Sequence, residues 1–451
     1  MTLHYMEWIE GMDREAARGW VLDWIAHNPP EGPCARWAGW NAYALSLRVV
    51  VWMQVWARHG WSPEAPPPAV IQRSMLDQLR DLSRRLERDL GGNHLIKNLK
   101  ALIWGAAFFR GDEATQWFNQ AQRLLDRELQ SQILPDGFHF ERSPAYHLQV
   151  LADLLEIRQV WPPEIPCPLL DEALDRMAQV AADMTHPDGL TSQFSDGGLH
   201  MSYAPARCLE VYQFLRGRVV APRATFVLPD GGYVGLRNGT SLVLWDVGPV
   251  GADHLPAHGH ADLLALEWSV NGQRVLVYPG VYEYETGPLR ALCRGTFGHN
   301  TVTIESADQC ELWGSFRLGR RSRATLDQIE FKNGHFEASA HHPSYKHLPG
   351  SPVHYRRILS DGHRLEVIDR IDSTRAVAAQ ATFLLHPACV PIGGGIFETP
   401  IGRIGFTSTA AWELREFEWF PDLGTRFSTH LLVIQLDSLN IANQMVWNLL
   451  P

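Results

Sequence analysis

The hydrophobic pattern of this 451-residue sequence changes once, near residue 222, and this change limits the folds that the chain can adopt. Before it, apolar residues recur at helical spacing, as on one face of the helix predicted over His94–Phe109. After it come short β-rich runs separated by glycine and asparagine, such as THLLVIQLD near the C-terminus. The pattern predicts a helical domain over residues 1–222 and a β domain over residues 223–451.

Each half has the pattern of one architecture. The helical half predicts consecutive helices over Trp40–Trp56, Ile71–Leu90, His94–Phe109 and Glu113–Leu134, and then one that starts at Ser143-Pro144. Paired helices of this kind favour an (α/α) toroid. In the second half, Asn271-Gly272 predicts a hairpin turn between alternating strands, as in an antiparallel β-sandwich. The predicted fold class is α+β and multidomain, an N-terminal toroid followed by a C-terminal sandwich.

Composition excludes several classes of protein. Apolar residues make up 45% and charged residues 20% of the chain, which is typical of a globular protein. The net charge of -10 argues against a nucleic-acid partner, and an acidic ligand would need a local basic pocket. No apolar run is long enough to span a membrane, and six scattered cysteines form no CxxC pair. No signal peptide is visible, so we expect a cytoplasmic protein, or a periplasmic or secreted one if a signal was removed.

Three clusters place polar groups among apolar residues. The first is Asn93-His94 at a helix start, where Asn93 is either a helix cap or a functional group. The second cluster lies in a turn and the helix start that follows it, and its members are His139, Glu141, Arg142, Tyr146 and His147. Either Glu141 and Arg142 are a surface ion pair, or the cluster is a functional site.

The third cluster is rich in histidine. In a strand, His258 and His260 project to the same face, and His299 is available from another strand. Two imidazoles on one face with a third nearby form a plausible zinc site. The alternative is a set of hydrogen-bonded histidines at a domain seam.

Several segments together resemble the heparinase II/III-like polysaccharide lyases. They are WNAYALSLRVVVW, GGNHLIKNLKAL, DGFHFERSPAYHLQVLADLL, DVGPVGADHLPAHGHADLLALEWSVNGQRVLVYPGVYEY and RGTFGHNTVTIE, which follow one another in the family's order between about residues 37 and 305. The resemblance implies a toroid followed by an antiparallel sandwich, in agreement with the hydrophobic pattern. It also implies cleavage of a uronic-acid polysaccharide by β-elimination.

The resemblance assigns a role to residues of each cluster. Asn93 corresponds to the residue that neutralises the substrate carboxylate, with His94 assisting. Tyr146 corresponds to the acid that protonates the leaving O4 oxygen, and either Tyr146 or His258 is the base that removes the C5 proton. The residues implied to bind substrate are His139, Glu141, Arg142, Trp40 and Trp104, although the tryptophans fit a hydrophobic core equally.

The implied zinc site departs from the family pattern. The family holds a structural Zn²⁺ between counterparts of His260 and His299 and an aspartate, whose position is Tyr278 in this sequence. A phenol, with a pKa of about 10, is a poorer ligand than a carboxylate. Asp262 or water completes the shell, or the site holds no metal. No organic cofactor is implied.

Two other functions remain open. A glycoside hydrolase on the same fold needs two positioned carboxylates, and Glu141 is the evident one. A non-catalytic glycan-binding or exopolysaccharide-processing protein needs neither Tyr146 nor His258. The expected partner in each case is an acidic polysaccharide or oligosaccharide, with no nucleic acid and no membrane span. The sequence leaves the glycan (heparan, chondroitin, alginate or bacterial exopolysaccharide) and the oligomeric state undetermined.

Overall fold

A computed structural model describes residues 2–31, 38–60, 66–332, 334–436 and 440–450. The chain divides into two compact units, one of Met1–Gln132 with Val150–Leu174 and the other of Ile133–Gln149 with Asp175–Pro451. Helices dominate the first unit and antiparallel strands the second, so the predicted fold class is confirmed. No helix among these residues is long and apolar enough to cross a membrane.

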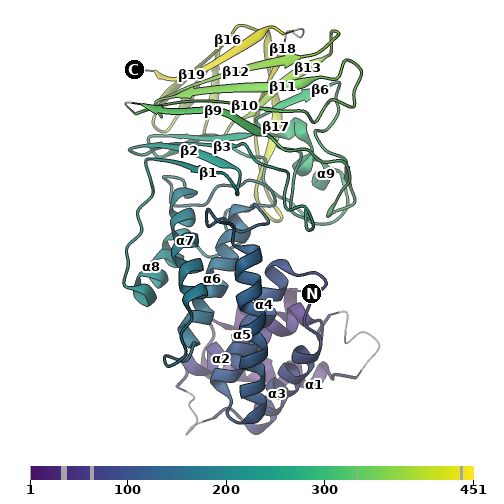
Figure 1. Cartoon of the computed structure of the whole chain (residues 1–451), viewed down its shortest axis with the longest axis vertical. Coiled ribbons are helices and arrows are strands. Elements are labelled where there is room, and N and C mark those ends of the chain that lie inside the picture. Colours follow the sequence, from purple (N-terminus) through teal and green to yellow (C-terminus); the bar gives the residue numbers. More distant parts are fainter. Residues whose placement is uncertain (1, 32–37, 61–65, 333, 437–439, 451) are drawn as a thin grey trace. The chain divides into compact units, whose positions relative to one another are not determined.

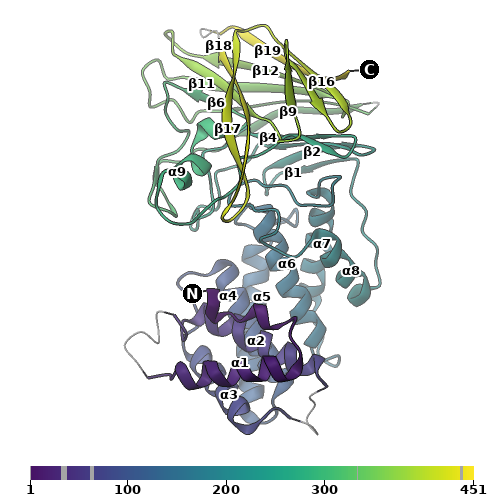
Figure 2. The same cartoon turned by 180° about the vertical axis from the view of Figure 1, so that it is seen from behind.

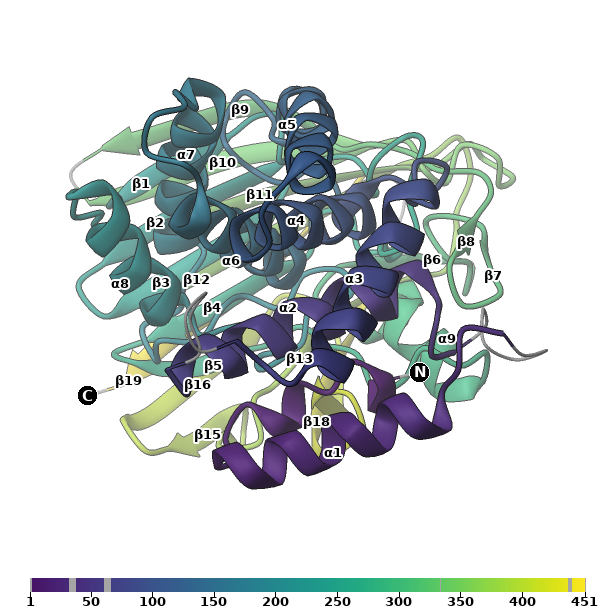
Figure 3. The same ribbon diagram turned by 90° about the horizontal axis from the view of Figure 1, so that it is seen from below.

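The first unit is built on helices with buried faces. They are α1 (Arg14–His27), α2 (Ala42–Arg58), α3 (Ala69–Arg84), α4 (Gly92–Phe108), α5 (Asp112–Gln132) and most of α6 (Pro144–Val160). Figure 3 shows α4 between α2 and α5, and α4 contacts both of these helices. Most residues of α2 and α4 are buried, as their nearly continuous apolar sequences require.

Two details of the predicted helices were wrong. The helix predicted over Ile71–Leu90 ends at Arg84, and the chain then turns toward Gly91 and Gly92, whose positive φ angles of 63° and 56° suit glycine. Asn93 is not a cap, because Gly91 occupies the N-cap position and Asn93 lies within α4.

Two large sheets and a smaller one form the second unit (Figure 1). The first has the order β1 (Thr225–Leu228), β2 (Tyr233–Asn238), β3 (Ser241–Asp246), β4 (Leu266–Val270) and β5 (Gln273–Leu276). The second has the order β14 (Val390–Gly393), β15 (Ile396–Thr399), β16 (Gly402–Ser408), β19 (Ala442–Leu450), β12 (Arg364–Asp372), β11 (Val353–Ser360), β10 (His335–His342) and β9 (Thr325–Lys332). The third has the order β17 (Trp412–Asp422), β18 (Thr425–Leu436), β13 (Ala379–Leu384) and β6 (Val302–Ile304), and the long hairpin of β17 with β18 is seen in Figure 2.

The sheets share one hydrophobic core. The core includes the fully buried Trp245, Trp268 and Trp447, which come from β3, β4 and β19. The turn predicted at Asn271-Gly272 joins β4 and β5, as expected. A two-stranded hairpin of β7 (Leu312–Trp313) and β8 (Arg317–Leu318) and the short helix α9 (Pro288–Arg294) lie outside these sheets.

The histidines of the third cluster do not lie in strands. His258 and His260 lie in the irregular segment between β3 and β4, where Pro249, Pro256 and Gly259 interrupt a ladder. His299 follows a single 3₁₀ turn, Thr296–Gly298. The boundary predicted at residue 222 lies between α8 (Pro205–Arg216) and β1, although the second unit also includes the last part of α7 (Pro168–Asp183) and all of α8.

Candidate active site

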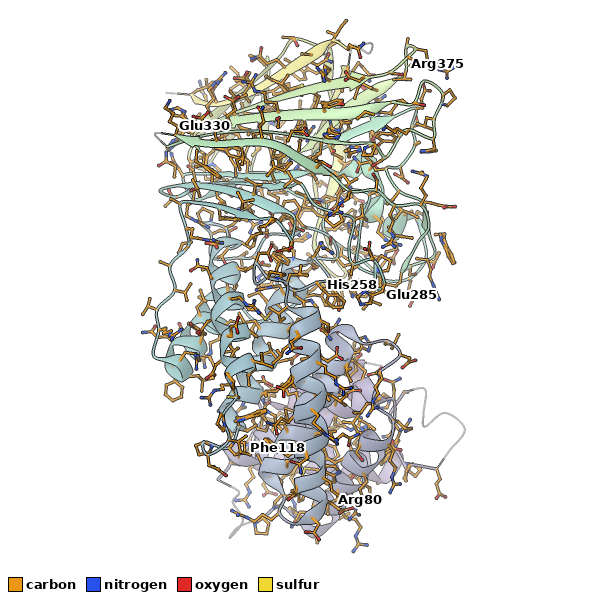
Figure 4. The ribbon with its side chains drawn as sticks, viewed as in Figure 1. Arg80, Phe118, His258, Glu285, Glu330 and Arg375 are labelled. Carbon is orange, nitrogen blue, oxygen red and sulfur yellow. The ribbon has the colours of Figure 1, made fainter. Side chains whose placement is uncertain are left out.

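Tyr146 and His258 form a stacked pair within the second unit. Tyr146 lies in the first turn of α6, and its ring centroid is 3.9 Å from that of His258 at an interplanar angle of 27°. The Tyr146 hydroxyl lies 3.0 Å from the hydroxyl of Tyr284, and Tyr146 is only 8% exposed. The structure thus brings together two residues that sequence reasoning had placed in separate clusters. His258 is labelled in Figure 4.

His258 lies between two buried carboxylates. Its Nδ1 hydrogen bonds to Oδ2 of Asp196 at 3.0 Å, and its Nε2 lies 3.3 Å from Oε2 of Glu141. A neutral imidazole carries one proton, and the bond to Asp196 places that proton on Nδ1. Nε2 is then the nitrogen that gains a proton when the ring becomes an imidazolium, and the Glu141 carboxylate beside it accepts from that protonated form.

Asp196 organises the site although sequence analysis did not identify it. Arg290 on α9 donates to both of its carboxylate oxygens, and His260 donates to Oδ1 from Nε2 at 2.9 Å. Burial opposes ionisation of Asp196, yet Arg290 and the hydrogen bonds from His258 and His260 hold the pKa of Asp196 well below its ordinary value. The backbone N–H of Asp196 also donates to the carbonyl of His258, which ties the two segments together.

The Tyr146 phenol is protonated at neutral pH. Burial raises the pKa of Tyr146 well above its ordinary value, and Tyr284 and Asp196 add to the shift. A phenol in this state is a proton donor and a poor base. The stacked pair therefore places a protonated phenol beside the His258 ring.

The rest of the second cluster supports these two residues. His139 is fully buried, burial lowers its pKa to about 4, and its backbone N–H donates to Nδ1 of His147 at 3.2 Å. Arg142 donates to the carbonyls of Asp230 and Gly251, both at 3.0 Å, and so anchors the segment that leads to His258. The contact of His139 and Arg142 with substrate stays a prediction.

The predicted catalytic and substrate-binding residues that remain belong to the first unit. Asn93 is buried at 4% exposure, and His94 contacts Oε1 of Glu87 through Nδ1 at 3.2 Å. Trp40 and Trp104 lie in the core of the helices, 5% and 8% exposed, and their indole N–H groups donate to backbone carbonyls. The alternative that both tryptophans are core residues is therefore the one that the structure supports.

The residues of the expected zinc site do not fit a metal as they stand. Both ring nitrogens of His260 are hydrogen-bonded, Nε2 to Asp196 and Nδ1 to the hydroxyl of Tyr278 at 2.9 Å. That hydroxyl also lies 2.6 Å from Oδ2 of Asp262. Nε2 of His299 is buried and has no hydrogen-bond partner among the described residues, so this nitrogen is available as a metal ligand. No group of three or more His, Cys, Asp or Glu side chains in the described part of the chain is arranged to hold a metal.

Comparison with known proteins identifies the family. The heparinase II/III N-terminus model matches residues 5–213, and the heparinase II/III-like C-terminal model matches residues 220–437. The chain belongs to the heparinase II/III-like family. The resemblance inferred from sequence segments is confirmed.

Relatives and solved structures agree with this assignment. A heparin-sulfate lyase of Bacteroides stercoris is 32% identical over 118 residues, which are 24% of this chain and 17% of the relative. A heparin-sulfate lyase of Bacteroides thetaiotaomicron is 25% identical over 183 residues, 39% of this chain and 24% of the relative. A crystal structure of heparinase III has a TM-score of 0.78 at 18% identity, covering 99% of this chain and 76% of that one. The heparan sulfate lyase HepC of Pedobacter heparinus has a TM-score of 0.68 at 19% identity, with the same coverage, and both structures support the fold.

Proposed function

We propose that this protein is a polysaccharide lyase that cleaves a uronic-acid glycan by β-elimination. The stacked pair of Tyr146 and His258 carries the proposal, because it offers a protonated phenol beside an imidazole whose Nε2 is the basic nitrogen. The two heparin-sulfate lyase relatives support the reaction class and favour a glycosaminoglycan as substrate.

β-Elimination needs a base and an acid, and this pair provides one residue for each. His258 Nε2 takes the C5 proton of the uronate, and the electrons of the C5–H bond form the C4–C5 double bond as the C4–O4 bond breaks. Tyr146 transfers its phenolic proton to O4 as that oxygen leaves. The proton taken by His258 is returned to Tyr146 directly or through water, which regenerates the enzyme.

Asp196 stabilises the charged form of the base. When His258 becomes an imidazolium, the ionised carboxylate at Nδ1 offsets the new positive charge, as in other carboxylate–histidine pairs. The substrate carboxylate needs a partner that strengthens its contact as negative charge develops. We propose Asn93 for that role, with His94 assisting, on the strength of the family resemblance.

Hydrolysis is less well supported than elimination. A hydrolase needs two carboxylates that reach the glycosidic bond, one as acid and one as base or nucleophile. Asp196 is fully buried and both of its oxygens bind Arg290, so it has no oxygen left for a sugar. Among the described residues, Glu141, 1% exposed, is the other carboxylate within ion-pair distance of His258.

The product distinguishes the candidate functions. Purified protein is incubated with heparan sulfate, chondroitin sulfate, hyaluronan and alginate, and the ultraviolet absorbance of an unsaturated uronyl end is followed alongside reducing ends. We expect both signals to rise together on a glycosaminoglycan. Reducing ends without the ultraviolet signal would indicate a hydrolase, and binding without either signal would indicate a non-catalytic protein.

A further inference from the structure

The segment around the β7–β8 hairpin concentrates positive charge in an acidic protein. The sequence FRLGRRSR places Arg317, Arg320, Arg321 and Arg323 within seven residues, whereas the chain as a whole has a net charge of -10. Three of these arginines are exposed, and Arg321 is half-buried. Among the residues that the structure describes, none of the four forms an ion pair with a carboxylate.

Two exposed arginines elsewhere on the second unit are ion-paired, whereas Arg375 and Arg403 resemble the four in having no ion pair among the described residues. Arg357 pairs with Glu337 on β10, and Arg415 pairs with Glu413 on β17. Within FRLGRRSR, Arg320 and Arg321 donate to backbone carbonyls, and the Arg317 guanidinium lies 5.7 Å from the ring centroid of Trp313. An arginine without an ion-pair partner is available to an anionic ligand.

The same hairpin exposes aromatic surface. Trp313 is 57% exposed and Phe316 is 40% exposed, both at the tip of the hairpin. An exposed indole is flat and amphipathic, so it offers a face for a sugar ring, while guanidinium groups pair with carboxylate or sulfate oxygens. The hairpin thus presents side chains for both chemical parts of an acidic sugar.

The hairpin is held beside the catalytic pair. The Phe316 ring lies 5.4 Å from the ring of Tyr284 and 6.3 Å from the ring of His258, as measured between centroids. Arg290 donates to the carbonyl of Ser315 at 2.8 Å with the same guanidinium that binds Asp196. Figure 3 shows β7, β8 and α9 at one edge of the second unit.

A second anchor links the basic segment to the chain that precedes His258. The Arg321 guanidinium donates to the carbonyls of Ala252 and Asp253 at 2.9 Å and 2.8 Å. Arg294 donates to the carbonyls of Gly314 and Ser315, both at 3.1 Å. These hydrogen bonds hold the main chain of the hairpin in place.

We propose that Trp313, Phe316 and Arg317 form a subsite for an acidic sugar next to the linkage that is cleaved, and that Arg323, further along the same basic segment, adds to its positive charge. The ligand is a polysaccharide that carries sulfate or carboxylate groups, with one ring against Trp313 and its anion against Arg317. The carboxylate that contacts this segment, Glu311, accepts from the backbone N–H of Arg320 and leaves the guanidinium groups of Arg317 and Arg323 unpaired. This subsite rests on the proposed lyase function for its biological role, although its binding is measurable without turnover.

The test compares two double variants of equal charge. R317A/R323A removes the exposed cations, and R375A/R403A removes two exposed arginines elsewhere on the second unit; Arg375 lies at the opposite end of that unit from His258 (Figure 4). Calorimetry gives the Kd for a heparin hexasaccharide, and assays give kcat and KM. We expect the first variant to raise Kd and KM about tenfold or more, equivalent to about 1.4 kcal/mol, with kcat within about twofold and the control unchanged. W313A is expected to weaken binding without changing the dependence of Kd on salt.

Further ligands identify the anion. A larger loss with the sulfated hexasaccharide than with its desulfated form assigns the arginines to sulfate, and an equal loss assigns them to carboxylate; both results support the subsite. Equal Kd and KM values for the two double variants would overturn it, as would equally tight binding of a single-stranded DNA oligonucleotide. Loss of binding in R317A/R323A with no unsaturated product from any variant would instead refute the lyase proposal and leave the subsite standing.

Discussion

The carboxylate of Asp196 lies 3.0 Å from Nδ1 of His258 and favours a proton on that nitrogen, because Arg290 keeps the carboxylate ionised. The two residues are 62 positions apart in the chain. Their contact turns an ordinary histidine into one with a defined tautomer, in the manner of catalytic carboxylate–histidine pairs. Asp196 does not need to touch substrate for this purpose, and we regard it as a positioning residue.

Replacing Asp196 with asparagine tests this role. We expect D196N to lower kcat by about 10²-fold or more, since the amide neither holds the tautomer nor stabilises the imidazolium. In an H258A background the same change is expected to cost little further activity, because positioning acts through His258. Independent losses in the double variant would indicate a structural role alone.

Asp369 supplies the matched control for that experiment. It is fully buried and accepts from both Arg356 and His354, so it has the same kind of partners as Asp196 within the sandwich. We expect D369N to lower the melting temperature while the folded enzyme keeps its kcat. Nitrogen-15 chemical shifts of His258 report the tautomer and should change in D196N only.

Removing the Tyr146 hydroxyl should abolish most turnover. Y146F keeps the ring stacked on His258 but has no proton for the leaving oxygen, so we expect kcat to fall by about 10²- to 10⁴-fold. Circular dichroism and the Kd for substrate should remain close to the wild type. Activity within a few-fold of wild type would remove Tyr146 from the mechanism.

Truncation of Asn93 separates catalysis from binding. If the amide contacts the substrate carboxylate as charge develops, N93A lowers kcat more than it raises KM. N98A serves as a comparison within α4, because Asn98 is fully buried and hydrogen-bonds Glu87. A change confined to KM in N93A would make Asn93 a binding residue.

The metal content of the protein is a further prediction. Both ring nitrogens of His260 are hydrogen-bonded, one to Asp196 and the other to Tyr278. We therefore expect protein purified without added metal to contain no stoichiometric zinc, and a chelator to leave its melting temperature unchanged. Y278D removes one of those bonds and supplies a carboxylate, and zinc should stabilise this variant. Stoichiometric zinc in the wild type, lost in H260A, would contradict the prediction.

Acid should destabilise the second unit through its buried histidines. Burial lowers the pKa of His147 to about 3 and that of His139 to about 4, against 6.5 for an ordinary histidine. Between these values the unfolded chain binds more protons, so stability is full above pH 6.5 and falls as the pH drops, by about 1.4 kcal/mol per pH unit for each histidine. Urea unfolding at pH 7 and pH 5 measures the difference, and equal stabilities would contradict the pKa directions.

Local patterns in the sequence predict the elements of the fold but not the partners of the site residues. The spacing of apolar residues located α4 to within two residues, and Asn271-Gly272 located the turn between β4 and β5. The helix ending at Arg84 was predicted too long, because a charged, exposed segment can carry helical composition without forming a helix.

The missing parts of the site depend on contacts between distant segments. Arg290 and Asp196 are 94 residues apart, and Tyr284 and Tyr146 are 138 residues apart, so no spacing rule connects them. A weak signal existed for Asp196, which lies in the glycine-containing turn SDGG. Burial of Trp40 and Trp104 was likewise undetermined, since the same residue type serves cores and sugar-binding surfaces.

Hydrogen bonds to main-chain carbonyls hold the β7–β8 hairpin in place. Arg290 and Arg294 bind the carbonyls of Gly314, Ser315 and Arg317, and every amino acid provides a carbonyl. The side chains of Trp313 and Arg317 are thus separable from the support of His258, whereas the Phe316 ring contacts Tyr284 and His258. If the proposed lyase function and subsite hold, replacing Trp313 and Arg317 should change which glycan is bound while the residues around His258 stay as they are.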